Sequence, residues 1–235
     1  MGWLNNSNIL KYVLVSSILK YGSANFHRIL CIGDSITHGI GSTNFQNSSY
    51  PARLEEILSK PTSSALGDTI SVLNFGLMDS TVQKFSRNSY WKSDIYKDAL
   101  NHANFSTIII FQFGADVHSI LRENIYIDDY KSLIESFRLM NPNLHIFVCI
   151  PPPRYRRRRV TNSSSTVMEF DERMINVTTI ISIETKSHLI DIYSIMGGKQ
   201  LTMGEYFTGN GIHPNDIGYQ VMATTIAKAL HPFLI

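Results

Sequence analysis

The sequence predicts a three-layer α/β/α sandwich built on a mostly parallel sheet. Short apolar runs alternate with segments of helical periodicity from Phe26 onward. The run at residues 106–113 (STIIIFQF) is continuous and β-branched, as expected of a central parallel strand that is covered on both faces. With 235 residues, of which 43% are hydrophobic and 17% charged, the chain is long enough for one sizeable domain and too apolar to be disordered.

The elements of this fold are predicted in order along the chain. Strands are expected at residues 28–33, 69–75, 106–113, 145–150 and 189–192. Helices are expected at residues 50–60, 127–140, 168–186 and 214–230. In the first helix, Leu54 and Leu58 recur at helical spacing, and Pro142 follows the end of the second. Pro214 suits the first position of the last helix, where its missing N–H costs nothing.

Residues 1–25 are expected to form a basic amphipathic segment ahead of a single domain at residues 26–235. The most apolar part of this segment is residues 9–21, and its longest lysine-free stretch, residues 12–19, is too short to span a bilayer, so no transmembrane span is predicted. No acidic residue occurs before Asp34, a bias that resembles a transit peptide or a short signal sequence. Three roles stay open: a helix packed on the domain, a targeting segment, or a helix that docks on a partner.

The net charge and the two cysteines argue against several classes of function and site. The formal net charge of +2 is too balanced to imply binding to nucleic acid or membranes by bulk charge. Cys31 and Cys149 lie inside apolar runs and are expected to be buried strand residues. A reducing intracellular compartment is therefore favoured over secretion, with the mitochondrion left open by the basic N-terminus. No cofactor is expected, and no metal site, because Asp79, Asp116 and His213 include no closely spaced ligand pair.

Two segments carry candidate catalytic residues. The first predicted strand ends in Gly33-Asp34-Ser35, which exposes the serine hydroxyl at the edge of the sheet where ligands bind. Asp34 is expected to be structural and to accept hydrogen bonds from backbone N–H groups of the turn. Near the other end of the chain, His213 directly precedes a helix, and the polar Asn210 lies three residues earlier. Because serine needs an adjacent base to become a nucleophile, Ser35 and His213 form a candidate dyad.

Six motifs strengthen this hypothesis by their order and spacing. They are GDSIT (33–37), SYPARL (49–54), VLNFG (72–76), YW (90–91), FGAD (113–116) and GIHPN (211–215). Together they resemble the SGNH (GDSL-type) hydrolase family, and most closely its carbohydrate O-acetylesterase-like branch, from about Arg28 to Leu230. The resemblance implies an SGNH/flavodoxin-like fold and metal-free hydrolysis of acyl esters, with Ser35 as nucleophile and His213 as base.

The remaining family positions depart from the pattern. The acid that orients the histidine is Asn210, whose amide can accept a hydrogen bond but adds no charge; an Asp to Asn change in a serine protease triad costs about 10⁴ in rate. The resemblance implies three oxyanion donors: the Ser35 N–H, a glycine N–H and an asparagine side chain. Gly76 is kept, but the oxyanion glycine has become Asp79 and the asparagine has become Asp116. Either carboxylate would repel an oxyanion, a protonated Asp116 could donate instead, and a positive φ would strain Asp79.

Two further features are candidates for ligand binding. Tyr90 and Trp91 resemble a sugar-stacking platform of the family, with core packing as the alternative. Arg154 and Arg156 begin a dense arginine run after the strand at residues 145–150, on the side where substrates bind in this fold. This run could bind a substrate or another anionic group, or it could be a solvated loop.

These observations leave two main functional hypotheses. In the first, the chain is an SGNH-fold protein with an eroded site and little or no esterase activity, which serves with protein partners as a structural or accessory subunit of a larger assembly. In the second, it is an active serine esterase that removes acetyl or other short acyl groups from a carbohydrate or small alcohol through Ser35 and His213. A binding module that retains carbohydrate affinity without turnover is a third alternative.

Overall fold

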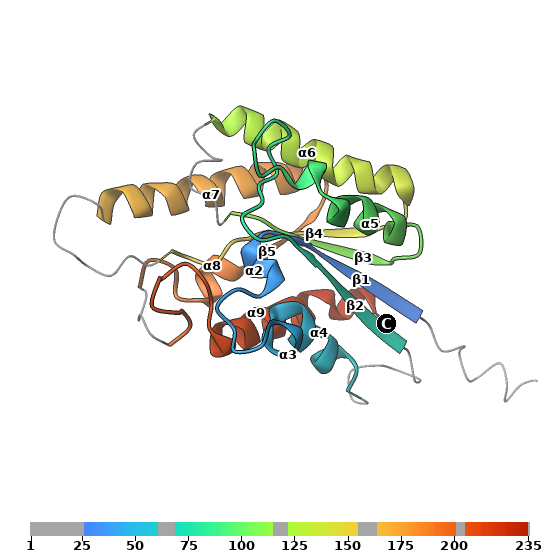
Figure 1. Cartoon of the computed structure of the whole chain (residues 1–235), viewed down its shortest axis with the longest axis horizontal. Coiled ribbons are helices and arrows are strands. Elements are labelled where there is room, and N and C mark those ends of the chain that lie inside the picture. The colour runs from blue at the N-terminus through green and yellow to red at the C-terminus, as the bar shows by residue number, and fades with distance from the viewer. Residues whose placement is uncertain (1–25, 61–68, 115–121, 155–163, 201–204, 235) are drawn as a thin grey trace, which may run out of the picture.

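The computed structural model describes residues 26–60, 69–114, 122–154, 164–200 and 205–234, which form a parallel sheet between two layers of helices (Figure 1). The strands are β1 (Phe26–Gly33), β2 (Thr69–Gly76), β3 (Ile108–Gln112), β4 (His145–Ile150) and β5 (His188–Asp191). They pair in the order β2-β1-β3-β4-β5, and every pairing is parallel. The predicted fold class is confirmed.

The two faces of the sheet are covered by different helices (Figure 1). One layer contains α5 (Asp94–Ala103), α6 (Glu123–Met140) and α7 (Ser164–Glu184), and the other contains α4 (Tyr50–Leu58) and α9 (Asp216–Leu230). The shorter helices are α2 (Ser35–His38), α3 (Phe45–Ser48), α8 (Ile192–Ile195), η1 (Tyr90–Lys92), η3 (Gly198–Gln200) and η4 (His231–Phe233). None of the helices within the described ranges is both long and apolar enough to cross a bilayer.

The side chains of β1 point alternately to the two faces of the sheet, which explains why residues 29–32 form a continuous apolar run. Ile29 and Cys31 pack in the core beneath α4 and α9, whereas Leu30 and Ile32 pack in the core beneath α5 to α7. A strand covered on both faces has no solvent-facing position to fill with a polar residue. The expected burial of both cysteines is confirmed, since neither Cys31 nor Cys149 is accessible to solvent or joined in a disulfide.

Two features of the helices differ from the prediction. Helix α5 was not predicted, because the residues that it buries fully, Ala99 and Ala103, are small and give a weak apolar signal. The placement of Pro214 at the first helical position was wrong. Asn215 is the N-cap of α9, and its side chain accepts a hydrogen bond from the Gly218 N–H at 3.0 Å, so Pro214 precedes the cap.

The register of the sheet brings distant segments together at one edge. Gly33, the last residue of β1, pairs with Gly76 of β2 on one side and with Gln112 of β3 on the other. The three strands therefore end level with one another. The segments that follow them, which carry Ser35, Asp79 and the third-strand glycine Gly114, leave the sheet at the same edge.

Candidate active site

Ser35 is held in a tight turn at the carboxyl end of β1. It is the first residue of α2, and Asp34 caps this helix by accepting a hydrogen bond from the Ile36 N–H at 3.0 Å. The second carboxylate oxygen of Asp34 accepts from the Gly114 N–H at 3.0 Å. The prediction that Asp34 binds backbone N–H groups is confirmed, and through these contacts it fixes the serine turn to the end of β3.

His213 contacts the serine from the opposite end of the sequence. Its Nε2 atom lies 2.9 Å from Ser35 Oγ. The loop that carries His213 is closed by a bridge between Phe207 and Pro214 and by a hydrogen bond from the Thr208 N–H to the His213 carbonyl at 2.9 Å. The structure thus brings together the two predicted dyad residues, which are 178 positions apart, within hydrogen-bond distance.

Asn210 contacts the other ring nitrogen of His213, with its Nδ2 atom 2.9 Å from Nδ1. The amide oxygen is occupied elsewhere: it accepts from the N–H groups of Ile212 at 2.9 Å and His213 at 3.1 Å. The Thr208 hydroxyl lies a further 2.9 Å from the same oxygen. Since an amide NH₂ cannot accept hydrogen bonds from backbone N–H groups, these contacts fix the orientation of the side chain. The oxygen that was expected to accept from the histidine therefore faces the backbone.

This orientation determines which nitrogen of the neutral imidazole carries the proton. An NH₂ group donates, so Nδ1 of His213 must accept with its lone pair, and the proton must be on Nε2. In that tautomer Nε2 donates to Ser35 Oγ and cannot take the serine proton. The tautomer that acts as a base has Nδ1–H, which would point at the amide N–H groups of Asn210. The resting arrangement therefore disfavours the basic form of the dyad.

Burial and two neighbouring charges also shift the pKa of His213. Burial lowers the pKa of His213 below its usual value, because the cationic form loses hydration. The positive charge of Arg154 lowers this pKa further, whereas the carboxylate of Asp79 opposes the shift. His213 is consequently neutral at neutral pH, and both neighbouring charges lie close enough to influence it.

Gly76 of the VLNFG motif and Asp79, which follows that motif, do not serve as one oxyanion unit. Asp79 adopts the left-handed conformation, with φ of 58°, that was expected for the position of the family's glycine. Its backbone N–H donates to no described residue and remains available at the edge of the sheet. The N–H of Gly76, by contrast, donates to Asn74 Oδ1 at 2.9 Å. Gly76, which was grouped with the oxyanion positions, therefore has no free N–H for an oxyanion, and its lack of a side chain lets α2 pack closely on β2.

Tyr90 and Trp91 are held by other protein groups. Tyr90 has no accessible surface, and its hydroxyl donates to the Phe75 carbonyl at 2.8 Å. The Trp91 indole N–H donates to the Val82 carbonyl at 2.8 Å, and the Lys84 ammonium lies 4.7 Å from the centre of a Trp91 ring. The core-packing alternative therefore accounts for Tyr90, and the sugar-stacking interpretation of this residue is wrong.

Arg154 follows β4, and its side chain reaches the segment after β3, close to the dyad. Its Nη2 atom donates to the Gly114 carbonyl at 2.8 Å, and its guanidinium carbon lies 4.1 Å from the centre of the Phe170 ring. Next to Phe170, burial raises the pKa of Asp171 to about 6, even though this carboxylate accepts a hydrogen bond from the Arg154 N–H at 3.4 Å. The other two predicted residues, Asp116 and Arg156, lie outside the described residues.

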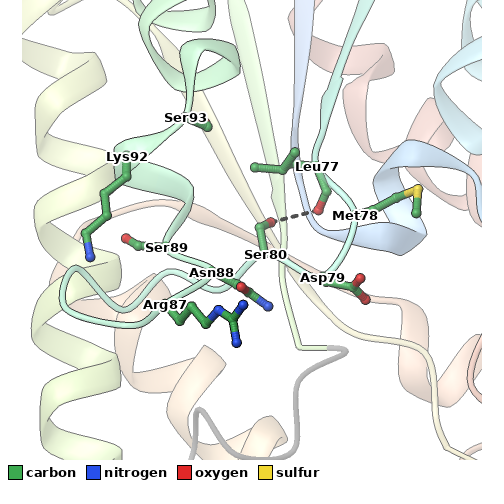
Figure 2. A pocket seen from close by; sticks show the side chains of 9 residues that line it. All are labelled: Leu77, Met78, Asp79, Ser80, Arg87, Asn88, Ser89, Lys92 and Ser93. Atoms are coloured by element: carbon green, nitrogen blue, oxygen red, sulfur yellow. Dashed lines mark hydrogen bonds between the residues drawn. The ribbon is translucent and has the colours of Figure 1, made fainter.

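Sequence reasoning missed a pocket that begins at Asp79. The cavity has a volume of about 400 Å³ and lies in the loop between β2 and α5 (Figure 2). Its lining residues are Leu77, Met78, Asp79, Ser80, Arg87, Asn88, Ser89, Lys92 and Ser93. The serine-rich, basic composition of residues 86–93 was the available signal, but such a stretch is also typical of a solvated loop.

Comparisons with known proteins agree with this geometry. The sequence model of the GDSL-like Lipase/Acylhydrolase family matches residues 31–221. The chain is 25% identical to an acetylxylan esterase of Xylanibacter ruminicola over 223 residues, a match that covers 86% of this chain and 43% of that protein. The chain thus spans less than half of that curated relative.

Solved structures share the fold. A lipase/acylhydrolase from Enterococcus faecalis superposes with a TM-score of 0.61 at 17% identity, covering 89% of this chain and 97% of that one. A two-domain esterase active on acetylated mannans superposes with a TM-score of 0.64 at 16% identity, covering 95% of this chain and 54% of that one. At these identities the likeness establishes the arrangement of the elements and not the substrate.

Proposed function

Because the chain belongs to the GDSL-like lipase/acylhydrolase family, we propose that it is a carboxylic ester hydrolase of low intrinsic turnover, acting on short acyl esters through Ser35 and His213. The observation that carries this proposal is the distance of 2.9 Å between Ser35 Oγ and His213 Nε2. A serine and an imidazole at hydrogen-bond distance, at the edge of the sheet where ligands bind, are what acyl transfer to serine requires.

The reaction would proceed in two halves. Ser35 Oγ attacks the acyl carbonyl while His213 Nε2 accepts the serine proton, and the histidine then returns that proton to the leaving alkoxide. Water releases the acyl group from Ser35 by the same steps in reverse. The negative charge on the carbonyl oxygen would be met by the N–H groups of Ser35 and Asp79, neither of which is bonded to another described residue.

Low turnover is proposed because of Asn210. Its amide favours the tautomer of His213 that cannot accept the serine proton, and it supplies no negative charge to stabilise the imidazolium that forms. In the serine protease triad, the corresponding substitution costs about 10⁴ in rate through the same tautomer defect. The carboxylate of Asp79 adds a smaller penalty, since it would lie near the negative charge of the oxyanion.

The substrate class is proposed from the relatives. An acetylxylan esterase and an esterase active on acetylated mannans are both similar to this chain. We therefore expect an acetyl or other short acyl group on a carbohydrate or small alcohol. The second candidate function is an accessory subunit without turnover, and the specific observation that favours it is the amide orientation of Asn210.

Hydrolysis of p-nitrophenyl acetate by the wild type and the Ser35→Ala variant, from pH 5 to 9, tests the proposal. We expect slow turnover that depends on Ser35, accompanied by acetate release from acetylated xylan or mannan. If the two proteins have the same rate at every pH, the ester hydrolase proposal is wrong and the accessory role gains support. His102→Ala is a suitable control, because that half-buried histidine of α5 lies outside the dyad.

A further inference from the structure

The pocket at Asp79 contains an arginine that the proposed chemistry does not use. Arg87 is exposed, and no hydrogen bond or ion pair links its guanidinium to a described residue. In Figure 2 the guanidinium of Arg87 and the amide of Asn88 point toward the side of the pocket that Asp79 occupies. At about 400 Å³ the cavity is within the size range of small-molecule sites, and it starts at the proposed oxyanion donor.

The loop that presents Arg87 is held in place by hydrogen bonds on both sides. The Thr81 N–H donates to the Asn88 carbonyl at 3.0 Å, and the Tyr90 N–H donates to the Thr81 carbonyl at 2.9 Å. On the far side, the Lys84 N–H donates to Asp129 Oδ2 at 2.9 Å. A loop fixed in this way holds the backbone at Arg87 in place before any ligand arrives, so that binding has to order only the side chain.

The charges of the lining favour an anionic ligand. Among the lining residues that the structure describes, Arg87 and Lys92 are cations and Asp79 is the single anion, so this part of the lining carries a net positive charge. Lys92 is turned toward the Ser86 carbonyl, to which it donates at 3.0 Å, so Arg87 is the cation of the described lining that is left to meet a ligand. Ser89 also lines the pocket, and its buried Oγ has no partner among the described residues. A planar guanidinium with free N–H groups matches carboxylate, sulfate or phosphate oxygens in a two-point contact.

We propose that Arg87 binds an anionic group of the substrate, so that the preferred ester is an O-acylated acidic saccharide in which a carboxylate or sulfate lies near the acyl group. This inference rests on the proposed function for the ester itself. It goes beyond that function because it assigns the charge of the alcohol part and the residue that selects it. A neutral saccharide could accept hydrogen bonds from the guanidinium through its hydroxyls, but it would supply neither a negative charge nor a two-point acceptor.

Ligand binding to the Ser35→Ala variant tests the inference without requiring turnover. The probes are D-galacturonate, D-galactose 6-sulfate and D-galactose, and the readout is the shift of backbone amide NMR signals of residues 77–93. We expect at least one acidic probe to bind about tenfold more tightly than galactose, and addition of Arg87→Gln to abolish this preference, as expected for loss of a charged hydrogen-bond donor. Comparison of the two acids identifies carboxylate or sulfate as the recognised group.

Two further variants make the result specific. Lys228→Gln removes an exposed cation from α9, in the opposite helix layer, and should leave the preference unchanged. Arg87→Lys keeps the charge but loses the two-point contact, so it should retain only part of the preference. Equal binding of galactose and both acids, shifts confined to other regions, no binding of the acids at all, or a preference unchanged in Arg87→Gln would each overturn the inference. Because none of these outcomes depends on hydrolysis, failure here is distinguishable from failure of the proposed function.

Discussion

The side-chain amide of Asn210 presents its Nδ2 atom to Nδ1 of His213 at 2.9 Å, while its Oδ1 atom accepts from two backbone N–H groups of the same loop. A carboxylate at this position could satisfy both sets of contacts at once. One oxygen would accept from the backbone and the other from Nδ1–H, which leaves Nε2 free to accept the proton of Ser35. The low turnover that we propose therefore depends mainly on one atom, the nitrogen that Asn210 has in place of a second oxygen.

Asn210→Asp should raise kcat/KM for p-nitrophenyl acetate by about 10²- to 10⁴-fold, because the restored carboxylate selects the basic tautomer and stabilises the imidazolium. Asn44→Asp is the matched control: Asn44 likewise accepts a backbone hydrogen bond through its side chain, from the Gln46 N–H at 3.0 Å, but at an exposed helix cap in another loop. Hydrolysis that persists in the double variant Ser35→Ala/Asn210→Asp would mean that the gain does not come from the dyad.

The two charges near His213 should move its pKa in opposite directions. Asp79→Asn removes a negative charge that favours the imidazolium, so the pKa should fall further below its usual value. Arg154→Gln removes a positive charge that disfavours the imidazolium, so the pKa should rise. NMR titration of the His213 ring protons measures both shifts without relying on turnover, and shifts of the same sign in the two variants would contradict this account.

The fold could be predicted from the sequence because the buried strands β1, β3 and β4 each contain a continuous apolar run and most helices have a clear apolar periodicity. Helix α5 was not predicted because its fully buried residues are alanines, which contribute little to the apolar periodicity that identifies a helix. Ser35 and His213 were identified because their roles depend on where a strand ends and a helix begins, and the sequence marks both positions.

The rest of the site depends on geometry that the sequence does not encode locally. The sequence shows that residue 210 is an asparagine, but the orientation of its side-chain amide is set by two backbone N–H groups of the folded turn. Tyr90 was misread as a sugar-stacking candidate because its burial depends on strands that are distant in the sequence. Arg87 was not singled out, since one arginine in a polar, basic loop looks the same in the sequence whether it faces a pocket or open solvent.

Gly76→Ala should destabilise the fold by about 3 kcal/mol or prevent folding, because overpacking against an immovable backbone is costly. A Cβ at this position would lie 2.1 Å from the His38 nitrogen and 2.5 Å from the Thr37 carbonyl carbon, both backbone atoms of α2. Gly209→Ala is the control, since a Cβ there has no other atom within 4 Å. Thermal unfolding measures both variants, and equal melting temperatures would contradict the close packing of α2 on β2.

Asp171→Asn should stabilise the protein at pH 8 and have little effect near pH 4. Burial raises the pKa of Asp171 to about 6 in the folded state, whereas the unfolded value is near 3.8. The folded state therefore favours the protonated carboxyl, so stability is greatest below the unfolded pKa and is lost as the pH rises through about 6. An uncharged amide avoids this loss and can still accept from the Arg154 N–H. Thermal unfolding at pH 4, 6 and 8 measures the difference between variant and wild type, with the exposed Asp94→Asn variant of α5 as control. A gain in melting temperature that is the same at all three pH values would show that the carboxylate of Asp171 is not destabilised by burial.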